Sequence, residues 1–338
     1  MQASQQLSKY RNELKGVAIL WIVFFHMAFQ SPGILYHIQK IGYGGVDIFF
    51  FLTGYGLIHS LRKDQALSNY WRRRMSRILP AYLPFILCWM LVMLPRYDLR
   101  TTECIRSVLG NLFMIGYWLG TPSIFNWYMG SLFLFFLLAP VLFACISQSG
   151  KPIRIFGVLF SCSLFVGLCC IGDDRYMAIS RLPIFLLGMA FAMEWKNTWK
   201  PIVVRVTLWV SLLAGLGALL LCFYRYPELL GPYGMYWHPF VLITPPLCLI
   251  LCSFFRYMGK AQFLLTPLRI MGRASFEIYL FNVWAEKLCK ENRLDNPWIW
   301  LAVSLGCLFM GIGYHCMLKR IMKKIRAFRE KNVCCKNS

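Results

Sequence analysis

The chain has 338 residues, of which 58% are apolar and only 15% charged, and its formal net charge is +22. The charged residues fall in short runs between apolar stretches of membrane-spanning length, which excludes an ordinary soluble protein. The charge does not indicate nucleic-acid binding, because the basic residues lie beside the apolar stretches rather than in a separate polar domain. The sequence therefore predicts an all-α, polytopic membrane protein.

The apolar stretches predict about ten transmembrane helices. They lie near residues 14–34, 45–61, 79–95, 123–146, 153–171, 178–195, 202–223, 238–257, 271–289 and 297–318. If the chain starts inside and crosses ten times, 26 of its 36 Lys and Arg residues fall in cytoplasmic segments. This bias predicts that both termini are cytoplasmic. We expect the membrane to be a bacterial-type inner (plasma) membrane. We expect one transmembrane domain over 1–318 and a basic cytoplasmic tail over 319–338.

The 14 cysteines do not predict a metal site or a disulfide framework. Two pairs are adjacent in sequence, Cys169 with Cys170 and Cys334 with Cys335, and most of the others lie within apolar stretches. A buried cysteine in such a stretch behaves as a small apolar side chain. We therefore predict no bound metal.

The first predicted span carries an ionisable side chain, His26, within an apolar run. An ionisable group in hydrocarbon is costly and suggests a functional role. Lys15 is eleven positions earlier, which places the two within roughly 20° of one helical face and about 16 Å apart along the axis. A neutral imidazole there can accept a proton from a hydroxyl nucleophile. The alternative is a histidine that only hydrogen-bonds a neighbouring helix.

A basic cluster precedes the third predicted span, in the sequence Arg72-Arg-Arg-Met-Ser-Arg77. The segment 62–78 lacks Gly and Pro, and it predicts a helix along the inner interface. Arg73, Arg74 and Arg77 would share one side of that helix. Guanidinium groups bind phosphate oxygens in a bidentate manner, which favours a phosphate-rich cytoplasmic ligand. The alternative is that the cluster only sets the topology.

Three acidic residues lie near or within predicted spans. Asp47 begins the second span, where it can orient His26, bind acceptor hydroxyls, or simply favour a helix amino end. Glu277 and Glu286 are predicted to face the bundle interior, as is Arg181, and Glu277 can pair with Arg273 at i, i+4.

Several segments in this order resemble the acyltransferase-3 family of integral-membrane O-acyltransferases. They are Lys15 to His26, Gly44 to Gly54, Arg73 to Tyr82, Asn126 to Tyr128, Arg181 to Pro183 with Gly188, and Gly272 to Leu280. The resemblance implies that His26 is the essential histidine and that Lys15 is the basic residue preceding it. It also implies that Arg74 and Arg77 engage cytoplasmic acyl-coenzyme A (acyl-CoA). The family often has a histidine after the Tyr-Leu pair of the ninth span, whereas this chain has Phe281-Asn282.

These observations predict a membrane O-acyltransferase, most simply an O-acetyltransferase. We expect His26 and Asp47 to be catalytic, and Lys15, Arg73, Arg74 and Arg77 to bind acyl-CoA as co-substrate, with no permanently bound cofactor. The predicted acceptor is a hydroxyl of a cell-surface polysaccharide or lipid-linked saccharide, chosen by the outer loops at 96–122 and 224–237. The alternatives are a secondary transporter or flippase and a non-catalytic membrane scaffold.

Overall fold

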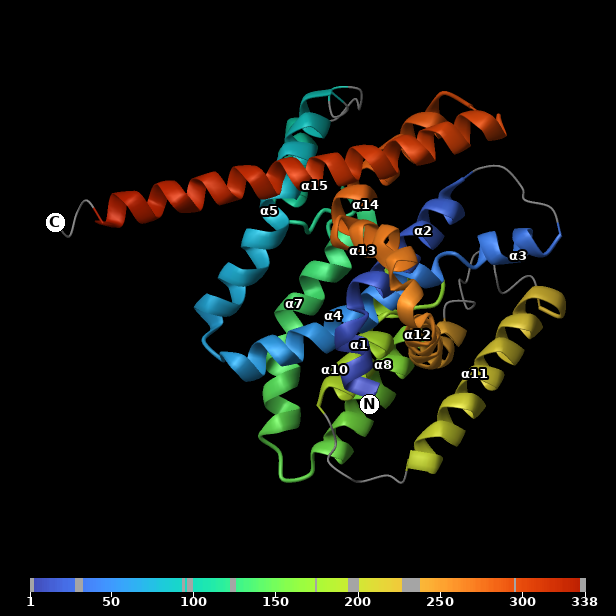
Figure 1. The fold of residues 1–338 in the computed structure, drawn as a ribbon. Helices are drawn as coiled ribbons and strands as arrows, with labels where there is room; N and C mark the ends of the chain where they lie inside the picture. Colours follow the sequence, from blue (N-terminus) through green and yellow to red (C-terminus); the bar gives the residue numbers. More distant parts are fainter. Residues whose placement is uncertain are drawn as a thin grey trace.

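The computed structural model describes residues 3–27, 33–92, 95, 100–121, 126–173, 175–193, 201–226, 238–294 and 296–334. Every regular element within these ranges is a helix, which confirms the predicted fold class (Figure 1). The helices are α1 Ala3–Lys9, α2 Arg11–His26, α3 Ile34–Lys40, α4 Gly44–Lys63, α5 Leu67–Val92, α6 Thr101–Leu112, α7 Asn126–Ser147, α8 Pro152–Cys169, α9 Tyr176–Ile179, α10 Leu182–Ala192, α11 Pro201–Tyr224, α12 Pro239–Tyr257, η4 Gly259–Leu265, α13 Thr266–Arg273, α14 Ser275–Glu291 and α15 Pro297–Cys334.

Seven of the described helices are long and apolar enough to cross a membrane: α4, α5, α7, α8, α11, α12 and α15. The other three predicted spans correspond to α2, to the α9–α10 segment and to α14. With 16 and 17 residues, α2 and α14 are about 24–26 Å long, slightly less than the roughly 30 Å of a bilayer core. The count of ten spans and the cytoplasmic placement of both termini stay predictions.

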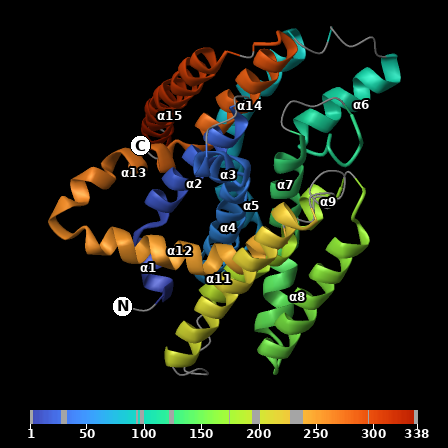
Figure 2. The same cartoon turned by 90° about the vertical axis from the view of Figure 1, so that its right-hand side faces the viewer.

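Helix α4 forms the centre of the bundle, and 83% of its most apolar window is buried. By contrast, only 11% of the corresponding windows of α8 and α11 is buried. Helix α11 lies on the outside of the bundle, at the right in Figure 1 and in front in Figure 2. Because its exposed residues are mostly Leu, Val and Trp, α11 presents a surface suited to lipid.

Glycines allow two pairs of helices to approach closely. A Cβ atom at Gly54 of α4 would collide with the carbonyl oxygen of Phe185 in α10, and one at Gly188 of α10 would collide with the carbonyl oxygen of Phe51. In the same way, Gly16 of α2 faces the backbone of α13. In membrane helices, where the hydrophobic effect does not drive association, small residues at such contacts allow the backbones to pack tightly.

Two helices continue past the boundaries that the sequence suggested. The basic segment predicted as a separate interfacial helix is the first part of α5, which passes through Pro80 and Pro84 without ending. A helix tolerates an interior proline when neighbouring groups satisfy the freed carbonyl. Likewise, the 38-residue α15 runs unbroken through 318 and 319, the predicted boundary between domain and tail.

Candidate active site

His26 is the last residue of α2 and faces α14. Its Nδ1 atom lies 2.5 Å from Oδ1 of Asn282 and 3.4 Å from Oε2 of Glu286. Glu286 also accepts a hydrogen bond of 2.6 Å from Lys290, one turn further along α14. The imidazole is 18% exposed, so it is shielded by protein yet reachable by a ligand.

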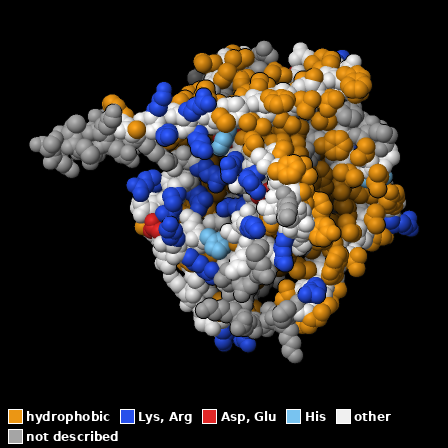
Figure 3. Space-filling view, in the orientation of Figure 1, with side chains coloured by type: hydrophobic (Ala, Val, Ile, Leu, Met, Phe, Trp, Pro, Cys, Tyr) orange, Lys and Arg blue, Asp and Glu red, His pale blue; other side chains and the backbone are white. Residues whose placement is uncertain are grey.

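A cavity of about 220 Å³ lies beside α2, between α4, α5, α7, α14 and α15. Its basic lining residues are Arg11, Lys15, Arg74, Arg77 and Arg273. Among the described residues that line it, Glu277 is the only carboxylate. In the space-filling view, Lys and Arg side chains gather on the face below α15, beside a broad apolar surface (Figure 3).

The basic residues of this cavity are short of acidic partners. Outside the cavity some cations are paired with carboxylates, as where Arg269 contacts Glu13 at 2.8 Å. Within the cavity, Arg11 donates to the carbonyl oxygen of Leu52 at 3.1 Å. The Nε atoms of Arg11 and Arg74 are buried without a hydrogen-bond partner among the described residues. Five cations facing one carboxylate constitute a site for an anion with several charges.

The cavity extends from the basic residues in the direction of His26. Its lining includes Ile22 of α2 and Tyr279 of α14, which precede His26 and Asn282 by about one helical turn. Lys15 and Ile22 both line the cavity, so they lie on one face of α2. This is the face that the sequence predicts for Lys15 and His26. Helix α2 therefore forms one wall of the cavity, whose lining ends on this helix at Ile22 and does not include His26 itself.

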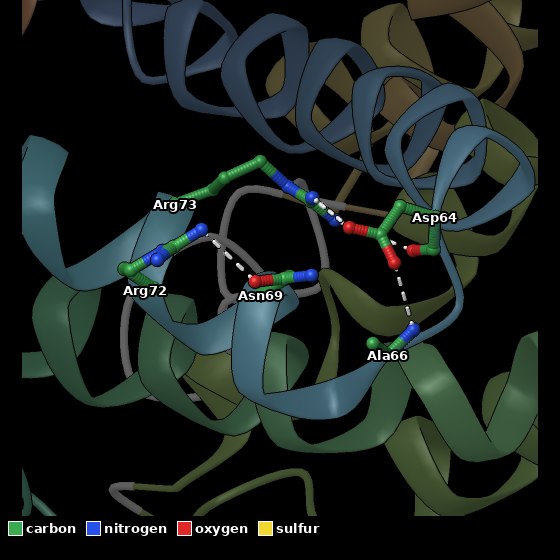
Figure 4. A network of polar contacts seen from close by, with 5 residues as sticks. All are labelled: Asp64, Ala66, Asn69, Arg72 and Arg73. Carbon is green, nitrogen blue, oxygen red and sulfur yellow. Dashed lines mark hydrogen bonds and ion pairs between the residues drawn. The ribbon is translucent and has the colours of Figure 1, made fainter.

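Arg73 belongs to a different contact from its neighbours. It donates to Oδ2 of Asp64 at 2.7 Å, at the junction between α4 and α5 (Figure 4). This hydrogen bond, together with one from the backbone N–H of Ala66, holds the pKa of Asp64 below its ordinary value. Arg74 and Arg77 line the cavity, whereas Arg73 fastens the beginning of α5 to the end of α4.

Asp47 lies away from the imidazole contacts just described. It is 1% exposed and pairs with the equally buried Arg181 at 3.7 Å. The guanidinium of Arg181 also lies over the ring of Trp127, 5.1 Å from its centroid. The carboxylate beside His26 is that of Glu286, so in this structure Asp47 does not orient the histidine.

The sequence did not identify every contact within the site. Glu277 accepts a hydrogen bond of 2.9 Å from His315, which joins α14 to α15. The sequence had instead suggested Arg273 as the partner of Glu277. Glu277 and His315 both line the cavity. Spacing along one helix predicts neighbours on that helix, but it does not identify partners on another. The predicted acceptor loop at 224–237 lies outside the described residues from 227 onward.

Known proteins of similar sequence transfer acyl groups. The O-acetyltransferase OatA of Staphylococcus aureus is 26% identical over 358 aligned positions, covering 92% of this chain and 56% of the relative. The putative peptidoglycan O-acetyltransferase YrhL of Bacillus subtilis is 25% identical, with 91% and 54% covered. The acyltransferase MdmB of Streptomyces mycarofaciens is 28% identical over 36% of this chain. The chain thus spans little more than half the length of the first two relatives.

The comparison with solved structures gave no match. The family described as acyltransferase domain matches residues 12–317. This range includes α2 apart from Arg11, the cavity-lining residues from Lys15 to His315, and the contact between His26 and Asn282. The family match covers far more than half of the sequence, so this multi-pass membrane protein belongs to the acyltransferase-3 family of acyl-transferring enzymes.

Proposed function

We propose that this protein takes an acyl group, most simply acetyl, from cytoplasmic acyl-CoA and transfers it to a hydroxyl of a cell-envelope saccharide. The observation that carries the proposal is the cavity in which five cations face one carboxylate and which ends one turn from His26. The donor combines several phosphate groups with a long arm that ends in a thioester. It therefore matches a site that is basic at one end and has a proton acceptor near the other.

Lys15, Arg74 and Arg77 hold the donor phosphates in this proposal, together with Arg11 and Arg273. The Nε atoms of Arg11 and Arg74 have no hydrogen-bond partner among the described residues. The donor arm then extends along α2 toward His26. Binding in this orientation brings the thioester and the acceptor together, which supplies the proximity that acyl transfer requires.

His26 is the general base of the proposed reaction. It takes the proton of the acceptor hydroxyl while the hydroxyl oxygen attacks the thioester carbonyl carbon. A carbon–oxygen bond forms, the carbon–sulfur bond breaks, and the proton passes to the departing thiolate. The products are an O-acyl ester and the free thiol, so no further reactant is needed.

The acceptor and the membrane are proposed on chemical grounds and by analogy. One relative is named as a putative peptidoglycan O-acetyltransferase, which suggests a saccharide hydroxyl of the cell envelope for this chain as well. The protein would then work in the bacterial plasma membrane, where cytoplasmic thioesters and envelope precursors are both within reach. Residues 319–338 form the cytoplasmic tail in this arrangement.

The test is thiol release from acetyl-CoA by purified protein in lipid nanodiscs, with and without envelope saccharides. We expect acceptor-dependent release by the native chain and at least about 10²-fold less for His26→Ala, because general-base catalysis contributes about that much. His37→Ala is the matched control, since His37 lies on α3 and contacts Phe223 and Tyr224 of α11, away from the cavity lining. Near-native activity of His26→Ala, or solute transport without thioester cleavage, would contradict the proposal.

A further inference from the structure

The Nδ1 atom of His26 lies between two hydrogen-bond acceptors from the same helix. Asn282 presents its Oδ1 atom at 2.5 Å, and Glu286 presents its Oε2 atom at 3.4 Å. The two residues are four positions apart on α14, so they share one face of that helix. Asn282 is 4% exposed, so little water competes for this contact.

This arrangement determines which imidazole nitrogen carries the proton. A carboxylate and an amide oxygen accept hydrogen bonds but cannot donate them. Nδ1 must therefore be the donor, both in the neutral ring and in the imidazolium. In the neutral ring the lone pair is on Nε2, the nitrogen that remains to act as a base.

We propose that Asn282 and Glu286 are positioning residues that keep His26 in its Nδ1–H form and so assign the base to Nε2. This inference rests on the proposed acyl transfer and deepens it. Asn282 holds the ring while it is neutral. Glu286 adds a negative charge that stabilises the imidazolium after the proton has been taken.

Lys290 moderates the effect of Glu286. It contacts the same carboxylate at 2.6 Å and is 61% exposed. Other described residues at this end of α2 make contacts with uncharged groups. Gln39 donates to backbone carbonyls of α2 and of Met27. The electrostatic environment of the ring is therefore set by one carboxylate that is partly neutralised by one ammonium group.

The decisive pair of variants is Asn282→Leu and Asn282→Asp. Leucine has a similar size but no acceptor, and aspartate retains an acceptor oxygen. We expect Asn282→Leu to lower kcat at least tenfold, because losing an orienting partner typically costs about 10–100-fold and a fixed wrong tautomer about 10⁴-fold. The KM for acetyl-CoA should change less than about twofold, and Asn282→Asp should recover most of the loss.

Asn292→Leu is the matched control. Asn292 directly follows α14, and its side chain donates to the carbonyl oxygen of Leu288 rather than to His26. Acetyl-CoA affinity and thermal stability report whether each variant is folded. A folded Asn282→Leu variant with native kcat would overturn the proposal, as would an Asn282→Asp variant no more active than Asn282→Leu.

Nitrogen-15 NMR of labelled histidine gives a readout that does not depend on activity. The resonance of His26, assigned by its loss in His26→Ala, should show Nδ1–H and a bare Nε2 in the native chain. An Nε2–H ring would overturn this inference even if acyl transfer occurs. An Nδ1–H ring in a protein without acyl transfer would support the positioning contact while contradicting the proposed function.

The pH–kcat profile tests the charged partners. We expect Glu286→Gln to move the acid limb to lower pH, because the imidazolium loses a stabilising charge, and Lys290→Met to move it by a smaller amount to higher pH. The second effect is smaller because Lys290 is largely exposed and screened. Glu291→Gln, an exposed change on the same helix, should leave the limb in place. Shifts of Glu286→Gln and Lys290→Met in one direction would contradict this assignment.

Discussion

Neighbouring arginines of one helix have different tasks in this protein. Arg74 and Arg77 line the cavity, while Arg73 is held by Asp64. Positions 74 and 77 are three apart and project from one face, whereas position 73 points toward the end of α4. The run of arginines therefore supplies both the lining of the cavity and a contact between α4 and α5.

This division predicts unequal effects of three alanine substitutions. Arg74→Ala and Arg77→Ala should each raise the KM for acetyl-CoA about tenfold or more, because each charge-assisted phosphate contact contributes about 1.5–3 kcal/mol. Arg73→Ala should change the KM least. Steady-state kinetics with acetyl-CoA as the varied substrate measures this, and an equal rise for all three would refute the division.

Asp47 and Arg181 form a buried ion pair, so their substitution should affect stability first. Removing one partner of such a pair costs roughly 3–5 kcal/mol, because the other charge stays buried. Asp47→Asn should lower the thermal transition of the purified protein by several degrees, while kcat per folded molecule stays within about threefold of native. A folded, stable Asp47→Asn protein without activity would show a catalytic role instead.

The sequence predicted the residues of the site unevenly. His26, Lys15, Arg74 and Arg77 were recognisable because charges are conspicuous in an apolar chain. Asn282 was not, because a single amide in a span looks like any hydrogen-bonding residue until the helix opposite it is known. The structure supplies the missing information, namely which face of α14 meets α2.

Some helix contacts in this bundle require glycine, because a side chain would not fit between the two backbones. At the contact of α4 with α10, Gly54 and Gly188 each face a backbone carbonyl of the other helix. This close packing buries α4, which carries Asp47 and the cavity residues Val46, Phe49 and Thr53. The spacing of these two helices therefore helps to set the width of the site.

A valine at Gly188 should separate these helices. Overpacking of a tight contact typically costs about 1–3 kcal/mol, so Gly188→Val should lower the yield and thermal stability of the protein. The control is Gly157→Val on α8, where an added Cβ meets nothing within 4 Å. Thermal aggregation followed by size-exclusion chromatography measures both, and equal stability of the two variants would contradict the packing argument.

At the level of elements, apolar runs predicted where the long helices lie but not where all of them end. The basic segment reads as a separate helix because Pro80 follows it, yet α5 continues through Pro80 and Pro84. Proline removes a hydrogen-bond donor, and whether the helix then stops depends on neighbours that satisfy the carbonyl. Local sequence does not contain that information.

For the molecule as a whole, the large net charge has two origins. Much of it lies in the segments that the predicted ten-span topology places inside, as the positive-inside rule requires of that topology. A smaller part surrounds the cavity, where cations outnumber carboxylates five to one among the described lining residues. Only the second part is expected to act on a ligand.

Donor binding should consequently depend on ionic strength. The Debye length falls from about 10 Å at 0.1 M salt to about 3 Å at 1 M, so the dissociation constant of acetyl-CoA should rise severalfold over that range. Isothermal titration of the nanodisc protein measures this. His26→Ala should keep the native slope and Arg77→Ala should flatten it, whereas a salt-independent affinity would argue against phosphate recognition in the cavity.

A site that binds its ligand through phosphate groups does not distinguish acyl-CoA from free coenzyme A. After each turnover the free thiol retains every group that the cations recognise, and it leaves no faster than the thioester would. The proposed reaction is therefore expected to be inhibited by its product, and its rate to follow the cytoplasmic ratio of acetyl-CoA to coenzyme A rather than the acetyl-CoA concentration alone.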